Sequence, residues 1–197
     1  MAMLKDKIQM GFTLPEILIG MVIASFLAGG LFLAFSESAF YFKKQMYRDN
    51  VEKYADIVMN DIFSSTINAS FVNIENKDEL TLGYRTNNQS VDSFKVYQSR
   101  PNQGILVNGK DLEYAFFHNK DQNKDYYMYL REFSVDHTFD GQGYDADLRD
   151  AIIEVFLGIE LYYKRGYLII KEEFPYKKTI FTRSAAAYNL SKEYDNE

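Results

Sequence analysis

Few side chains in this sequence belong to the types that usually catalyse reactions or bind metal ions. Cysteine is absent, which excludes disulfides, thiolate catalysis and cysteine-ligated zinc. The two histidines are too few for a multi-histidine metal site within one chain. His118 follows two phenylalanines at the end of an expected strand, and His137 lies in an expected polar loop. We interpret both as structural or solvated residues.

Sequence motifs of common enzymes are missing or out of place. The chain contains no G-x-S-x-G motif, which would mark the nucleophile of an α/β-hydrolase. Residues 141–146 fit the dinucleotide-binding pattern G-x-G-x-x-A, but they lie in an acidic loop without a clear preceding parallel strand. We therefore predict that the protein is not an enzyme.

Acidic side chains in the second half of the chain raise the question of a calcium site. Hard oxygen ligands at alternate positions of a loop are what Ca²⁺ requires. Tyr126, however, stands where an EF-hand needs a glycine, and residues 126–133 have the pattern of a strand. We predict solvated loop acids and no cofactor, with calcium as the alternative. The residues at positions 1, 3, 5 and 12 of the EF-hand count are Asp121, Asn123, Asp125 and Glu132.

Composition and charge limit the class of protein. Hydrophobic residues make up 47% of the 197 residues, as in an ordinary folded chain. The formal net charge is −6, so no basic face is expected that would bind nucleic acid. The 16 tyrosines and 16 phenylalanines favour strands.

One segment near the N-terminus is far more apolar than the rest of the chain. Residues 17–35 are 19 consecutive residues without a charge. As a helix they would be about 28 Å long, which is close to the hydrocarbon thickness of a bilayer. The segment has the length of a membrane anchor. A cleaved signal peptide, with a cleavage site near Ser36, is the alternative, although its apolar core would be unusually long.

The residues before this segment carry a specific motif. Gly11 and Phe12 are followed by Thr13, Leu14, Pro15 and Glu16, and two lysines lie upstream. This motif resembles the class III signal of type IV pilins and type II secretion pseudopilins. The resemblance implies that a prepilin peptidase cuts after Gly11, that Phe12 becomes the N-methylated first residue, and that Glu16 is the fifth residue of the mature chain.

Glu16 has two compatible interpretations. Thr13 and Glu16 fit a capping box, in which the glutamate reaches back to the start of the helix. A cap alone does not explain a carboxylate at the mouth of a membrane-spanning run, where an unpaired charge is expensive. The resemblance supplies a partner, the positive α-amine of Phe12 from the same or a neighbouring subunit. We prefer this charge-pairing role.

The spacing of apolar residues predicts one long helix from about Thr13 to Asn68. Its second half carries an apolar stripe of the kind that packs on a sheet. Gly29 and Gly30 mark either a bend or a site of close packing, and the sequence leaves both open. The stripe consists of Val51, Tyr54, Val58 and Ile62.

Beyond Asn68 the apolar period changes from helical to the alternation of strands. The clearest strand covers residues 153–161, and a turn expected at residues 163–166 leads into residues 167–170. Further strands are expected at residues 80–84 and 112–116, and polar loops at residues 86–90, 119–125 and 136–150. We predict an α+β fold in which a long N-terminal helix packs on an antiparallel sheet. The expected parts are a leader (1–11), a membrane or filament-core half-helix (12–36), an amphipathic half-helix (37–68) and a β-rich head (69–197).

The resemblance implies a minor pilin or pseudopilin that assembles into a type IV pilus or a type II secretion pseudopilus. The chain is most similar to the J-type minor pseudopilins of type II secretion or the equivalent minor pilins of type IV pili, and Glu16 argues against the tip pseudopilin type that lacks this acid. The implied partners are the prepilin peptidase, other pilins or pseudopilins, and inner-membrane assembly proteins. The implied location is the bacterial inner membrane, with a cytoplasmic leader and the head outside the cytoplasm. The alternative is a membrane-anchored adhesin or ligand-binding module that does not polymerise.

Overall fold

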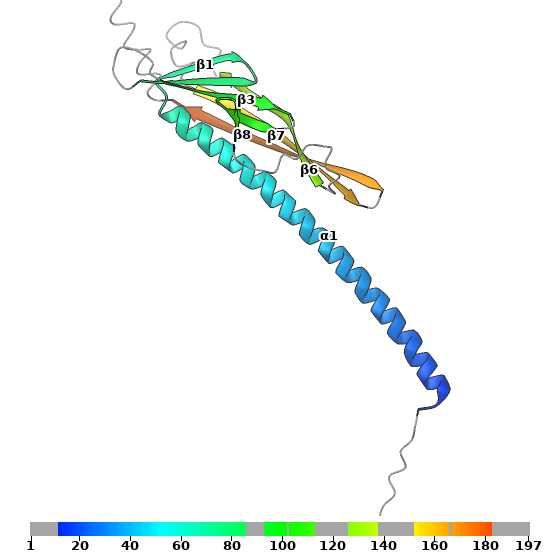
Figure 1. Ribbon diagram of the computed structural model, residues 1–197. Helices are drawn as coiled ribbons and strands as arrows, with labels where there is room; N and C mark the ends of the chain where they lie inside the picture. The colour runs from blue at the N-terminus through cyan, green and yellow to red at the C-terminus, as the bar shows by residue number, and fades with distance from the viewer. Residues whose placement is uncertain are drawn as a thin grey trace, which may run out of the picture. The chain divides into compact units, whose positions relative to one another are not determined.

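The protein has the predicted α+β architecture, with one long helix followed by antiparallel strands (Figure 1). The computed structural model describes residues 12–85, 93–101, 103–112, 126–137, 152–165 and 167–182. The elements are α1 (Leu14–Ile67), β1 (Phe71–Asn76), β2 (Glu79–Tyr84), β3 (Ser93–Arg100), β4 (Gly104–Val107), β5 (Lys110–Asp111), β6 (Tyr126–His137), β7 (Ile152–Arg165) and β8 (Leu168–Phe181).

The chain forms two compact units, Met1–Gln45 and Met46–Glu197. In the first unit, α1 begins where the carbonyl oxygen of Thr13 accepts a hydrogen bond from Ile17 N at 3.2 Å. The helix then continues through Gly29 and Gly30 without interruption. A Cβ at either glycine would meet no described atom within 4 Å. Neither glycine therefore breaks the helix, and neither packs against a described part of this chain.

The second unit contains two antiparallel sheets. One sheet is a meander in the order β1-β2-β3-β4-β5. Its last hairpin turns at Asn108 and Gly109, which both have positive φ (51° and 76°), as a two-residue Asn-Gly turn requires. Asn108 also joins the strands, because its Oδ1 accepts a hydrogen bond from Val96 N at 2.7 Å.

The other sheet consists of three long strands in the order β6-β7-β8. The pairing of β7 with β8 continues to Arg165 opposite Leu168, so the hairpin turns later than the sequence predicted. A bulge between Leu130 and Glu132 shifts the pairing of β6 with β7. On β8, which pairs with one described strand, Pro175 lies opposite Gly158 of β7.

The core of the second unit lies around α1. All four stripe residues predicted from the sequence are at most 1% exposed. The hydroxyl oxygen of Tyr54 accepts a hydrogen bond from Ile105 N of β4 at 2.8 Å, and burial raises the pKa of Tyr54 to about 12. On the other sheet, Lys178 of β8 donates to Asn60 of α1 at 3.2 Å. Both sheets therefore contact the helix.

A polar cluster at the end of α1 adds a second connection to the β1–β5 sheet. Lys95 Nζ on β3 lies 2.9 Å from Asp61 Oδ2, and it also donates to Ser65 Oγ at 2.9 Å. The hydroxyl of Tyr97 donates to Asp61 Oδ2 at 2.8 Å. Burial of Tyr97 raises its pKa, so the phenol stays protonated and remains a donor. The cluster keeps the polar side of the helix paired where it meets the sheet.

Several local predictions need correction. His137 is the last residue of β6 and pairs with Ile153, so it does not lie in a loop. Leu112 follows β5 and is not part of a strand, while His118 and the rest of the strand expected at 112–116 lie outside the described residues. The helix ends at Ile67, one residue before the expected end.

The division of the chain predicts that its β-rich part folds without the apolar segment. A fragment that begins at Glu37 should be soluble, monomeric and folded, because the buried stripe and all strands are retained. Circular dichroism, a cooperative thermal melt and analytical ultracentrifugation would measure these properties. An unfolded fragment, or one that stays with membranes, would show that the apolar segment is needed for the fold.

Candidate membrane-anchoring and assembly segment

The N-terminal part of α1 exposes a continuous apolar surface. Every residue from 12 to 39 is exposed within this chain. An 18-residue window of α1 has a mean hydropathy of 2.4, and none of it is buried. A helix that is apolar all round needs lipid or other apolar helices around it. This one is long and apolar enough to span a membrane.

The start of α1 places the carboxylate of Glu16 beside the backbone of Thr13. Thr13 N donates to Glu16 Oε2 at 2.8 Å, which is the half of the capping box that the sequence predicted for the glutamate. The hydroxyl of Thr13 donates to the same oxygen at 2.9 Å and does not cap a backbone N–H. Among the described residues, Glu16 Oε1 accepts no hydrogen bond. Glu16 can therefore accept a further donor while it caps the helix.

The residue before Thr13 indicates a candidate for this further hydrogen-bond donor to Glu16. Phe12, whose side chain is 84% exposed, immediately precedes Thr13. If the chain were cut before Phe12, the new α-amine would lie one residue from the backbone N–H that already binds Glu16 Oε2. Gly11 lies outside the described residues.

The residues considered for calcium are not brought together by the described structure. Glu132 lies on β6 next to the bulge, with its side chain exposed. Asp121, Asn123 and Asp125 lie outside the described residues. Within the part of the chain that is described, no group of three or more His, Asp or Glu residues could hold a metal ion.

A charged cluster that the sequence did not reveal lies on the β6–β7–β8 sheet. Glu160 of β7 is only 6% exposed, and its Oε1 lies 2.7 Å from Lys171 Nζ and 3.7 Å from Arg131 Nε. The hydroxyl of Tyr162 donates to Glu160 Oε2 at 2.6 Å. Both cations also pair with Glu173, at 2.8 Å from Lys171 and 2.6 Å from Arg131.

The charges of this cluster balance one another, because its two cations pair with its two carboxylates. Burial alone would raise the pKa of Glu160, but the hydrogen bonds from Lys171 and Tyr162 and the two nearby cations outweigh it and lower the pKa. Glu160 therefore stays ionised and paired, and it is poorly suited to accept a proton near neutral pH. The cluster cross-links the three strands of the sheet.

A shallow hollow of about 380 Å³ adjoins the cluster. Its floor includes Gly158, where a Cβ would come within 3.3 Å of the Phe156 ring. Arg131 and Glu173 at its rim are already paired with each other. The hollow holds no described pair of nucleophile and base, so it supports no catalytic proposal.

Comparison with known proteins adds no family. The chain matches no protein-family model, no curated protein and no solved structure. The candidate segment is therefore defined by its own residues, which are the Thr13–Glu16 cap and the exposed apolar helix.

The buried charge of Glu160 predicts a pH-dependent contribution to stability. Glu160→Gln should lower the free energy of unfolding at pH 7 by about 1 to 3 kcal/mol, because it removes charge-assisted hydrogen bonds. The folded-state pKa is depressed, so the contribution is present above the unfolded pKa of about 4.3 and is lost as the pH falls through the folded-state pKa. Denaturant titrations of the Glu37 fragment from pH 7 to pH 3 would measure it.

Glu154→Gln is a matched control on the same face of β7. The side chain of Glu154 is 30% exposed, against 8% for Glu160, and it pairs with Lys177 at 2.7 Å. This control should cost less stability because solvent screens the more exposed pair. Equal losses for both variants, or a Glu160→Gln loss that is independent of pH, would contradict the assigned role.

Proposed function

We propose that this protein is a minor pilin or pseudopilin, a structural subunit that is cut between Gly11 and Phe12 and assembled into a filament. One observation carries the proposal. An exposed helix begins directly after a Gly-Phe pair, and its uncharged run, residues 17–35, is preceded by a single acid, Glu16, at the fifth position counted from Phe12. A simple anchor needs the apolar surface but would use this acid only as a helix cap.

The exposed helix suits two successive environments. In the precursor, lipid covers residues 17–35. In a filament, the helices of neighbouring subunits cover them. Helices that leave lipid gain little from hydrophobic burial, so close packing and polar contacts must hold them together. Gly20, Gly29 and Gly30 leave open space on the helix surface that would allow another helix to approach.

Glu16 supplies the polar contact in this proposal. An α-amine created at Phe12 would be protonated near neutral pH, and methylation leaves it able to carry the proton. A buried amine and a buried carboxylate are each costly alone, whereas a pair relieves much of the penalty. The free Oε1 of Glu16 can accept the amine of its own or a neighbouring subunit without giving up the helix cap made by Oε2.

The proposal includes the partners and the location that processing requires. A prepilin peptidase would cut the leader on the cytoplasmic side, and inner-membrane assembly proteins would add the subunit to other pilins or pseudopilins. The second unit, Met46–Glu197, would then lie outside the cytoplasm. Within the family, the J-type minor pseudopilins of type II secretion, or their equivalents in type IV pili, are the class that we propose.

Processing makes the first testable prediction of this function. Coexpression with a prepilin peptidase should remove 11 residues and leave Phe12 at the N-terminus with one added methyl group. Intact-mass analysis of the membrane-extracted protein would detect both changes, and Gly11→Val should block them. A mature N-terminus near Glu37 would instead identify an ordinary signal peptide.

Variants of Glu16 separate charge pairing from helix capping. Glu16→Ala should be cleaved and inserted into the membrane normally, because the cleavage site and the apolar segment are unchanged, but its incorporation into filaments should fall sharply. Glu16→Gln keeps an acceptor for Thr13 N and loses the charge, so it should fail in the same way. Filament incorporation is measured by immunoblots of sheared filaments. If Glu16→Gln assembles normally and Glu16→Ala does not, capping is the role of Glu16.

The same fractionation separates the proposal from the alternative of an anchored adhesin or ligand-binding module. A pilin co-purifies with sheared filaments or pulls down other prepilins. A protein that stays entirely in the membrane fraction, in cells that produce the filament, does not polymerise.

A further inference from the structure

The tip of the β7–β8 hairpin exposes three consecutive apolar residues. Tyr167 is fully exposed, Leu168 is 69% exposed and Ile169 is 60% exposed. We call these three residues the hairpin tip. Lys164 and Arg165, both exposed, immediately precede the turn. The strand pairing continues up to Arg165 opposite Leu168, so a rigid ribbon carries the tip. Neighbouring apolar side chains that are this exposed mark a candidate site of contact with a protein or a membrane.

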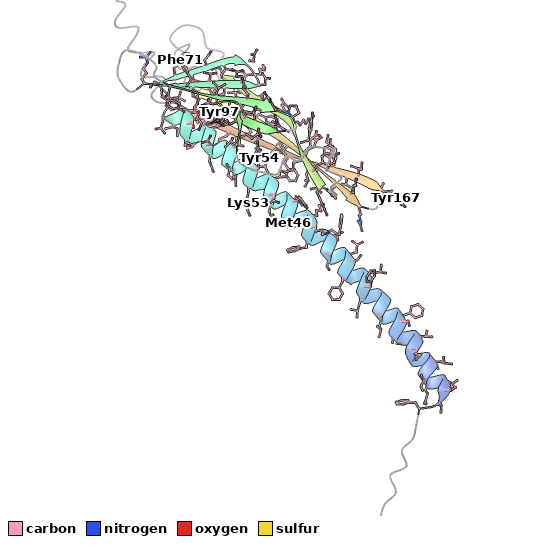
Figure 2. All side chains as sticks on the ribbon, in the orientation of Figure 1. Met46, Lys53, Tyr54, Phe71, Tyr97 and Tyr167 are labelled. Carbon is pink, nitrogen blue, oxygen red and sulfur yellow. The ribbon has the colours of Figure 1, made fainter. Side chains whose placement is uncertain are left out.

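The hairpin tip lies at the Met46 end of the second unit, which is the end where the chain passes from the first unit into the second. Lys178 of β8 contacts Asn60, whereas Glu172 lies 3.5 Å from Arg48, so earlier residues of β8 lie beside earlier residues of α1. Leu168 precedes Glu172 by four residues, which places the tip beyond Arg48. Figure 2 shows Tyr167 at the same end of this unit as Met46.

Aromatic stacking fixes this end of the unit. Tyr47 stacks on Tyr126, with their ring centroids 4.1 Å apart, and Tyr126 stacks on Tyr163 of the hairpin at 6.0 Å. The helix residue that begins the unit and the strand that carries the tip are therefore held together. Movement of the tip away from the Met46 end would break this stack.

The chain between the apolar segment and Met46 is short. Ten residues, 36–45, join Phe35 to Met46, and even a fully extended chain of that length reaches only about 35 Å. These residues include Phe40, Tyr41 and Phe42, followed by two lysines. Aromatic rings and lysines at the end of an apolar helix are typical of the membrane–water interface. The length of this connection therefore keeps Met46 within about 35 Å of any membrane that residues 17–35 span.

We propose that the hairpin tip inserts into the headgroup region of the membrane that α1 enters, as a second contact of the protein with lipid. Leu168 and Ile169 would reach the acyl boundary, and the ring of Tyr167 would lie among the headgroups. Lys164 and Arg165 would attract anionic lipids. This inference depends on the membrane anchor and is independent of filament assembly.

Two observations favour lipid over a protein partner. A stable protein–protein interface buries roughly 1,200–2,000 Å² of total surface, which three side chains at a hairpin tip cannot supply. The first acid that follows the tip along β8 is also paired, because Glu172 lies 3.5 Å from Arg48 Nε and accepts a hydrogen bond from the hydroxyl of Tyr163 at 2.8 Å. The tip therefore combines apolar side chains with a basic flank, which complements an anionic lipid surface.

The absence of cysteine allows a direct test with the full-length protein. Leu168→Cys would be labelled with an environment-sensitive nitrobenzoxadiazole dye and reconstituted into phosphatidylcholine–phosphatidylglycerol vesicles that contain headgroup-proximal spin-labelled lipid. The dye should show blue-shifted emission and strong quenching. Phe181→Cys is the matched control, because Phe181 is 50% exposed at the opposite end of β8, and its dye should not be quenched. Leu27→Cys, in the apolar segment, reports whether the anchor has inserted.

The result that overturns the proposal is an unquenched dye at residue 168 in vesicles where the Leu27→Cys dye shows insertion. A blue shift that disappears when the protein is diluted with lipid would also overturn it, because the tip would then contact a second copy. The same measurements on Ile169→Cys control for a local effect of the Leu168→Cys substitution. In the Ile169→Cys measurements, adding Lys164→Glu should reduce quenching in anionic vesicles but not in vesicles of pure phosphatidylcholine. If Lys164→Glu leaves quenching unchanged in both kinds of vesicle, the attraction of Lys164 to anionic lipid is contradicted.

Discussion

Burial of one face of α1 between Val51 and Ile62 is the interaction on which the second unit depends. The stripe lies at the centre of the core, and each of the two sheets contacts the helix through its own residues. Tyr54 contributes both packing and a hydrogen bond to this interaction. Its ring is buried in the core, and its hydroxyl oxygen accepts a hydrogen bond from the backbone N–H of Ile105. Without the helix, both sheets would expose an apolar face, and neither could bury it alone.

The same helix is suited to two different environments along its length. Between Val51 and Ile62 it is amphipathic, and protein covers its apolar side. From residue 17 to residue 35 it is apolar on every side, and no described part of the chain covers it. A continuous α-helix can serve both environments because all its interior backbone groups are paired within the helix. Only the first turn has free N–H groups, and there Glu16 accepts the N–H of Thr13.

Sequence patterns predicted those features that depend on neighbouring residues along the chain. The helix, its buried stripe and strands β2 and β7 follow from local periodicity, as does the reach of Glu16 back to Thr13. The division into two sheets and the strands β1, β3 and β4 were not predicted, because pairing partners are chosen by contacts across the whole chain. The Asp61–Lys95 and Glu160–Lys171 pairs were likewise invisible, since each residue alone resembles an ordinary surface charge. His137 looked like a loop residue because the polar residues that follow it dominate the local pattern.

Pro175 has a consequence for how this protein can associate with other chains. An outer strand as long as β8 offers a row of backbone groups on which a strand from another molecule could grow, which is how many β-proteins aggregate. Proline has no N–H to contribute to such a row, and charged side chains, among them Lys171, Lys177 and Lys178, recur along the same strand. Uncontrolled extension of the sheet along β8 is thereby discouraged. In the proposed filament, self-recognition is thereby left to the helix, where register and charge can be controlled.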